Sequence, residues 1–167
     1  LAVAPADADA HVSLGDLYAS LGRFQDAETE YRAYTSVRPQ NPDGPMKLGV
    51  LLVGMRRPVD AVEAFERASA LAPDNPDPHV RLAEVLMELR QPERSIAHAR
   101  RALEIAPSSA AHNLVGVALA SQGQLAEAVQ HFRTAVEIEP SNARAAENLA
   151  RAERLSPPRT PQADRQQ

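Results

Sequence analysis

The sequence contains no cysteine, no tryptophan and few other aromatic residues. Without cysteine the chain can form neither disulfides nor thiolate zinc sites, and thiol catalysis is excluded. Because only 4% of residues are aromatic while 44% are hydrophobic, packing must rely on small aliphatic side chains, chiefly alanine, which favours closely packed helices over sheets. The chain also lacks a run of the roughly 18 apolar residues that a membrane-spanning helix needs, so we expect no membrane insertion.

The balance of charge argues against nucleic acid as a partner. The chain carries 18 basic and 22 acidic residues, for a formal net charge of −4. It therefore has no positive excess with which to neutralise phosphates. Lys47 is the only lysine, and arginine in place of lysine, together with abundant alanine, is typical of GC-rich and often bacterial genomes. The composition does not determine the compartment, and we slightly favour a soluble, cytoplasmic protein.

A pattern of four positions recurs along the chain with a period of 33 or 34 residues. Its small and aromatic residues are spaced as one face of a helix, and its final proline blocks continuation of that helix. A chain that repeats itself at this period is a stack of equivalent units, each burying its apolar face on its neighbours. The recurring positions are Ala27, Tyr31, Tyr34 and Pro39; Ala61, Phe65, Ala68 and Pro73; Ser95, Ala99, Ala102 and Pro107; and Ala128, Phe132, Ala135 and Pro140.

The same period divides the chain into units. Asn41 before Pro42 is a helix-start signal, because asparagine caps free N–H groups and proline lacks one. Pro5 stands where Pro39 ends a helix, which indicates a truncated first unit and a longer parent array. We therefore expect the end of a preceding repeat at 1–7, repeats at 8–41, 42–75, 76–108 and 109–142, a C-terminal capping helix at 143–155 and a flexible tail at 156–167.

These patterns resemble the tetratricopeptide repeat family over nearly all of residues 1–155. The family pattern places Leu-Gly-x2-Tyr on a first helix, then Ala-x3-Phe and a final proline on a second. The sequence matches it with Leu14-Gly15-Tyr18 followed by Ala27, Tyr31 and Pro39, and with Leu48-Gly49-Leu52 followed by Ala61, Phe65 and Pro73. The resemblance implies an all-α, right-handed α-solenoid of stacked antiparallel helix pairs, whose first helices line a concave groove.

The resemblance also implies that the groove holds a peptide or a partner protein. We expect its lining to be the stripe beside the core face of each first helix, apolar in the middle and adaptable through its methionines. The chain would then be a protein-interaction scaffold. The predicted groove residues are Val12, Asp16, Met46, Lys47, Val50, Val53, Val80, Arg81, Glu84, Met87, Asn113, Val117 and Ala120.

Several alternatives accompany this interpretation. The array could instead be the accessory, substrate-positioning region of a larger enzyme such as a glycosyltransferase or hydrolase. It could self-associate through an open N-terminal end, where a missing helix exposes apolar surface. The proline-rich segment 156–161 could lie as an extended strand in a neighbour's groove. The carboxylate clamp of the best-known family variant is not expected, because Val12 and Asp16 replace its Lys and Asn and Arg81 alone matches its last Arg.

Neither catalysis nor a cofactor is expected. No phosphate-binding loop, paired-histidine metal motif or nucleophile elbow is present. His11, His79 and His112 occupy equivalent places in three units, at least one whole unit apart, so we predict that they pack at helix starts rather than bind metal. His98 and His131 also repeat, on the second helices, and we predict that they are solvated.

Overall fold

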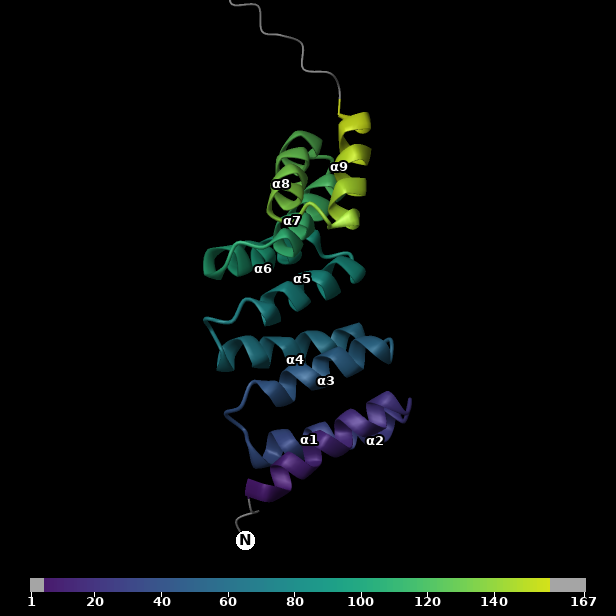
Figure 1. Cartoon of the computed structure of the whole chain (residues 1–167), viewed down its shortest axis with the longest axis vertical. Helices are drawn as coiled ribbons and strands as arrows, with labels where there is room; N and C mark the ends of the chain where they lie inside the picture. Colours follow the sequence, from purple (N-terminus) through teal and green to yellow (C-terminus); the bar gives the residue numbers. More distant parts are fainter. Residues whose placement is uncertain (1–4, 157–167) are drawn as a thin grey trace, which may run out of the picture.

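The computed structural model describes residues 5–156, which form a stack of helices and no strand (Figure 1). The segment expected to be a flexible tail lies outside the described residues from 157 onward. None of the described helices is both long and apolar enough to cross a membrane. The helices are α1 (Pro5–Ser20), α2 (Phe24–Val37), α3 (Asp43–Gly54), α4 (Pro58–Leu71), α5 (Asp77–Glu88), α6 (Pro92–Ile105), α7 (Ser109–Ser121), α8 (Leu125–Ile138) and α9 (Ala143–Leu155).

The helices are arranged as the predicted all-α solenoid, because each packs on the next along the chain. In addition, α5 contacts α7, and α7 contacts α9. Figure 1 shows the stack rising in sequence order from α1 to α9. The buried residues form two hydrophobic clusters, one centred on Phe65 and built from α2 to α5, the other centred on Phe132 and built from α5 to α9. The core is therefore distributed along the stack, with α5 contributing to both clusters, rather than gathered at a single centre.

Within a repeat, the aromatic ring of the second helix lies on the glycine of the first. A methyl group placed on Gly49 would lie 2.5 Å from Cε1 of Phe65, and Gly116 has the same relation to Phe132. Glycine therefore makes room for the ring. In the third repeat both partners change together: Ala83 takes the place of the glycine and Ala99 that of the ring, and both are fully buried.

The start of α1 corrects one expectation. Residues 5–7, assigned from the repeat period to the end of a preceding helix, form the first residues of α1. The rest of that expected segment lies outside the described residues. The physical reason is that proline can either stop a helix or occupy its first turn, where its missing N–H leaves no hydrogen bond unmade. The spacing of prolines alone does not distinguish the two.

The turns between paired helices contain one left-handed residue at the same place in every repeat. Gly22 and Gly123 have φ of 72° and 78°, and Arg56 and Arg90 take up the same conformation at 58° and 57°. Arginine adopts this region less readily than glycine does. In the second repeat Gly54 is the last residue of α3, and Arg56 takes the left-handed position of the turn.

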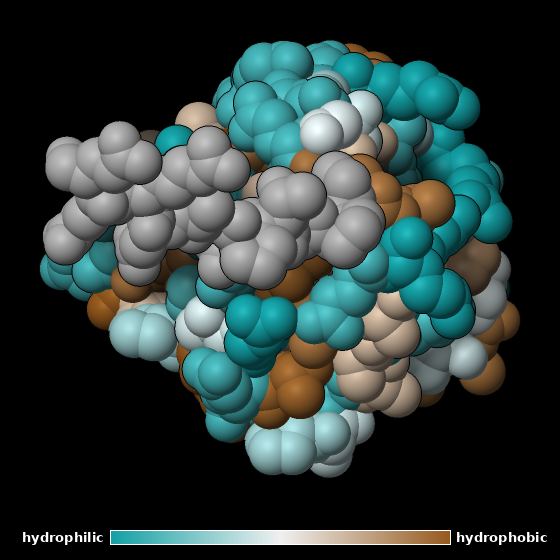
Figure 2. Space-filling view, turned by 90° about the horizontal axis from the view of Figure 1, so that it is seen from above, coloured by the Kyte–Doolittle hydropathy of each residue, from teal (hydrophilic) through white to brown (hydrophobic). Residues whose placement is uncertain are grey.

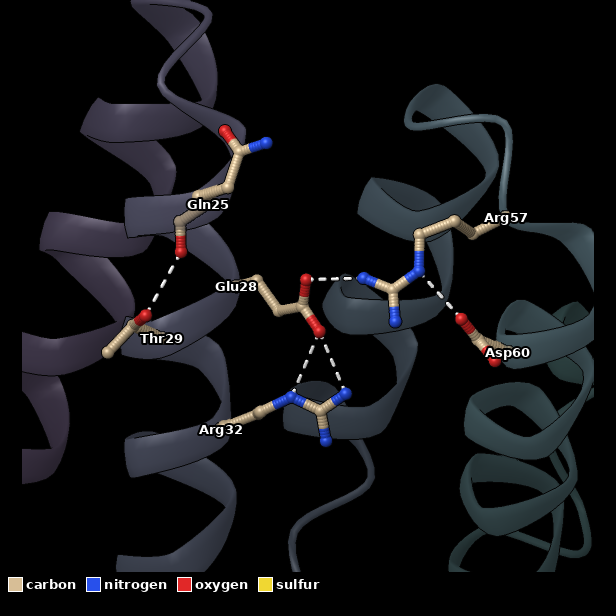
Figure 3. Close-up of polar contacts among 6 residues, drawn as sticks. All are labelled: Gln25, Glu28, Thr29, Arg32, Arg57 and Asp60. Carbon is tan, nitrogen blue, oxygen red and sulfur yellow. Dashed lines mark hydrogen bonds and ion pairs between the residues drawn. The ribbon is translucent and has the colours of Figure 1, made fainter.

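A network of ion pairs joins the second helix of one repeat to that of the next. The Glu28 carboxylate accepts hydrogen bonds from Arg32 on its own helix and, at 2.7 Å, from Arg57 at the start of α4 (Figure 3). Arg57 in turn donates to Asp60 at 2.6 Å. Because the Glu28 side chain is only 15% exposed, this network fixes α4 against α2 more firmly than a fully exposed ion pair would.

The stack ends in a helix with one buried side. Ala145 and Ala152 of α9 are buried, whereas Arg144, Glu147 and Arg151 are exposed. Viewed from above, hydrophilic residues lie across the top and upper right of the picture, and hydrophobic residues are visible in its middle (Figure 2). The Asn142 side chain caps α9 by accepting a hydrogen bond from the Ala145 N–H at 3.0 Å. A polar outer face of this kind is what a terminal helix of a repeat array needs.

Candidate functional site

An open depression of about 610 Å³ crosses the first helices of successive repeats. It runs over α3, α5, α7 and α9, with one ring contributed from α4. Its apolar surface includes Val50, which is 51% exposed, and the half-buried Val53, Met87 and Val117. The lining residues are Val50, Val53, Phe65, Arg81, Glu84, Val85, Met87, Glu88, Ala110, Asn113, Leu114, Val117, Asn142, Arg144 and Asn148.

The structure brings together only part of the predicted groove. The depression includes Val50, Val53, Arg81, Glu84, Met87, Asn113 and Val117. Val12, Asp16, Met46, Lys47, Val80 and Ala120 lie outside its lining. Val12 and Met46 pack partly buried against the first hydrophobic cluster, and Ala120 packs against the second. These three side chains therefore contribute to packing within the stack.

The depression also contains polar groups that the sequence analysis missed. The Asn148 side-chain amide donates to Oδ1 of Asn113 at 2.9 Å, which joins α9 to α7 across the depression. Asn148 precedes Leu149 as Lys47 precedes Leu48 and Arg81 precedes Leu82, so extending the repeat period from these two predicted groove residues would have included it. Arg81 and Glu84 form an ion pair at 2.9 Å, which leaves the lining with little net charge from these two residues.

Comparison with known proteins identifies the family. Sequence models described as tetratricopeptide repeats match residues 1–45, 52–117 and 116–152. The chain belongs to the tetratricopeptide repeat family. A search of curated protein sequences found no match.

Several solved structures share the fold of this chain. The MamA protein is 20% identical, with a TM-score of 0.81 over 89% of this chain and 81% of that one. YrrB, described as "a TPR protein with an unusual peptide-binding site", is 24% identical, with a TM-score of 0.72 over 87% and 75%. PilW, described as a type IV pilus biogenesis factor, is 20% identical, with a TM-score of 0.77 over 89% and 69%.

Asp16 and Lys47, both predicted as groove residues, form an ion pair with each other. The Lys47 ammonium donates to both oxygens of Asp16, at 2.8 and 3.0 Å, and the Tyr31 hydroxyl donates to one of them at 2.7 Å. Burial raises the pKa of the Asp16 carboxyl, but the hydrogen bonds from Lys47 and Tyr31 outweigh it and leave the pKa below its usual value. Asp16 is therefore ionised at neutral pH and ties α1 to α3.

The histidines overturn the prediction that His98 and His131 are solvated. Nδ1 of His98 lies 3.1 Å from Nδ1 of His79, and His131 is related to His112 in the same way at 3.1 Å. All four rings are partly buried. The physical reason is that positions 19 residues apart in a repeat face each other across its two helices. His11 occupies the corresponding place in the first repeat and contacts Glu30 at 2.7 Å.

Proposed function

We propose that the chain is a protein-interaction scaffold and that the depression over α3, α5, α7 and α9 binds a peptide segment of a partner protein. The observation that carries this proposal is the exposure of Val50, Met87 and Val117 on one surface although the opposite sides of their helices are buried. Apolar side chains left on a concave surface after the core is complete suit apolar anchors of a partner.

The shape and chemistry of the depression favour an extended peptide. Its lining comes from helices of three repeats and from the terminal helix, so it suits an elongated occupant more than a compact one. The paired amides of Asn113 and Asn148 carry donor and acceptor groups suited to a peptide backbone. Asn142, by contrast, is engaged in capping α9 and in donating to the Ser109 hydroxyl at 2.9 Å. The description of YrrB as having a peptide-binding site is consistent with this use of the fold.

Selection from a displayed peptide library tests the proposal. We expect the wild-type chain to enrich peptides with two or more apolar side chains, and the double variant Val50→Glu/Met87→Glu to bind them at least about tenfold more weakly, because each carboxylate would be desolvated by an apolar anchor. The measurement is the dissociation constant of each enriched peptide by fluorescence anisotropy.

The control is Ile138→Glu, which adds one carboxylate, half the charge of the double variant, at an exposed apolar residue at the end of α8, away from the depression. It is expected to bind the enriched peptides as the wild type does, and all variants should retain their helical circular dichroism. Equal binding by the double variant would assign the peptides to another surface. Peptide binding by the depression would be the same if the array were attached to a catalytic domain. The alternative that the array positions substrates for a larger enzyme therefore stays a separate prediction.

The exposed face of α1 favours a second candidate, self-association. Leu17 is 51% exposed, whereas its counterparts Leu51 and Val85 are 6% and 3% exposed under the preceding second helix. Leu14 of α1 and Leu21, the first residue after α1, extend this exposed surface. We infer that this face, defined by Leu14, Leu17 and Leu21, packs against the same face of a second copy, because a two-fold contact would remove these exposed leucines from water on both copies and close the assembly as a dimer.

Sedimentation velocity over a concentration series measures this association. We expect the wild-type sedimentation coefficient to rise with concentration and Leu17→Glu/Leu21→Glu to remain monomeric. Val59→Glu, which changes an exposed valine of α4, should behave as the wild type. A wild-type chain that stays monomeric at every concentration would contradict the inference.

A further inference from the structure

Four of the five histidines in the sequence form two pairs at equivalent places in the third and fourth repeats. His79 of α5 faces His98 of α6, and His112 of α7 faces His131 of α8. In each pair the two Nδ1 atoms lie 3.1 Å apart. None of the four lines the depression proposed as the peptide site, so the pairs need a separate explanation.

The spacing of the two nitrogens is that of two ligands of one metal ion. Imidazole nitrogens bind Zn²⁺ at about 2.0–2.1 Å, so two of them on one ion, at angles between octahedral and tetrahedral, lie roughly 2.9–3.4 Å apart. The ring centroids are 5.4 and 5.3 Å apart, and the planes are inclined by 26° and 37°. The two nitrogens of each pair therefore already have the separation of two ligands of one ion.

The protonation of the rings is compatible with metal binding. Burial lowers the pKa of all four histidines, so they are neutral at physiological pH. A hydrogen bond between two Nδ1 atoms requires one of them to carry the proton. Moving that proton to Nε2 of the same ring leaves two neutral imidazoles with both Nδ1 lone pairs available, and needs no other reactant.

We propose that each histidine pair binds one divalent transition-metal ion of the kind that prefers imidazole, such as Zn²⁺. Among residues 5–156 no group of three or more His, Cys, Asp or Glu is placed to hold a metal, so water completes the coordination. Imidazole and water ligands suit Zn²⁺, Ni²⁺ and Cu²⁺, whereas Mg²⁺ prefers oxygen ligands alone. The ion bridges the two helices of a repeat and stabilises the folded array by an amount that rises with the logarithm of the free ion concentration above the dissociation constant.

The charges around the two pairs rank them. The charge of Arg101 interacts electrostatically with His79, and the charges of Arg94 and Glu66 interact with His98. The other pair has only Arg100 and Glu127, both acting on His131. The surroundings of His79 and His98 thus carry one more positive charge, which repels a cation. We expect the pair formed by His112 and His131 to bind metal more tightly.

Titration of the untagged full chain with ZnCl2 in a buffer free of chelators tests the proposal. We expect about two ions per chain by calorimetry, one for each pair. At a hundredfold excess of Zn²⁺ over the dissociation constant, the unfolding temperature should rise by about 5 °C or more. MgCl2 at the same concentration should leave it unchanged. His131→Gln should remove the tighter ion, His98→Gln the weaker one, and the double variant both.

His11→Gln is the matched control, because it changes the one histidine outside the pairs. Glutamine can still hydrogen-bond to the remaining imidazole, and circular dichroism reports whether each variant keeps its helices. Imidazole ¹⁵N spectra should show Zn²⁺ at Nδ1 of His112 and His131. The proposal is overturned if Zn²⁺ produces no shift at millimolar concentration, if the double variant binds as the wild type does, or if coordination occurs at Nε2.

Discussion

Phe65→Ala is expected to lower the free energy of unfolding by about 3–5 kcal/mol. The Phe65 ring is the largest fully buried side chain of the first hydrophobic cluster, which includes Leu52 and Leu82. It also rests on the backbone of Gly49. Helices from neighbouring repeats surround the ring, so they cannot close over the cavity without disturbing the ion pairs and turns that set their spacing. Urea unfolding followed by circular dichroism measures the loss.

Val59→Ala provides the comparison for this prediction. Val59 is on the same helix and is exposed, so its truncation should change the free energy of unfolding by no more than about 0.5 kcal/mol. A loss below about 1 kcal/mol for Phe65→Ala would mean that the ring is not packed as described. Because each repeat is stabilised by its neighbours, we also expect the larger loss to weaken α3 and α5 along with α4.

The repeat period predicted the architecture because packing in a stack is local. Each helix pair contacts only its neighbours, so a spacing such as that from Ala61 to Phe65 carries most of the information needed to place the pair. The same pattern contains both Gly49 and Phe65, which the structure brings into contact. It could not place Arg56 at the left-handed turn position, since arginine is not a signal for that conformation.

The candidate site could be predicted from the sequence less completely than the fold could. A helical stripe shows which residues share a face, but a small rotation of the helix decides whether a residue such as Met46 lies in the depression or against the core. Contacts between the paired helices were also missed. His98 was predicted to be solvated from its position on its own helix alone. Its contact with His79 depends on how α5 and α6 cross. Asn148 was overlooked because the predicted groove was taken from the first helices of the four repeats and was not continued into α9.

The effect of Gly49→Ala on the free energy of unfolding is expected to differ in sign between the wild type and the Phe65→Ala variant. In the wild type the new methyl group would lie 2.5 Å from the Phe65 ring, and overpacking of this kind costs about 1–3 kcal/mol. In Phe65→Ala the space is vacant, so the same substitution should be neutral or stabilising by up to about 1 kcal/mol, because alanine forms helices better than glycine. Urea unfolding of the wild type, both single variants and the double variant measures the coupling.

The third repeat provides the physical precedent for this reversal. Ala83 and Ala99 occupy the places of Gly49 and Phe65, and both are fully buried, so a methyl on the first helix is accommodated where the second helix has no ring. Gly54→Ala is the control, since a Cβ there meets nothing within 4 Å and should cost nothing in either background. If Gly49→Ala costs the same with and without the Phe65 ring, the penalty comes from elsewhere in α3, and glycine is not at this position to admit the ring.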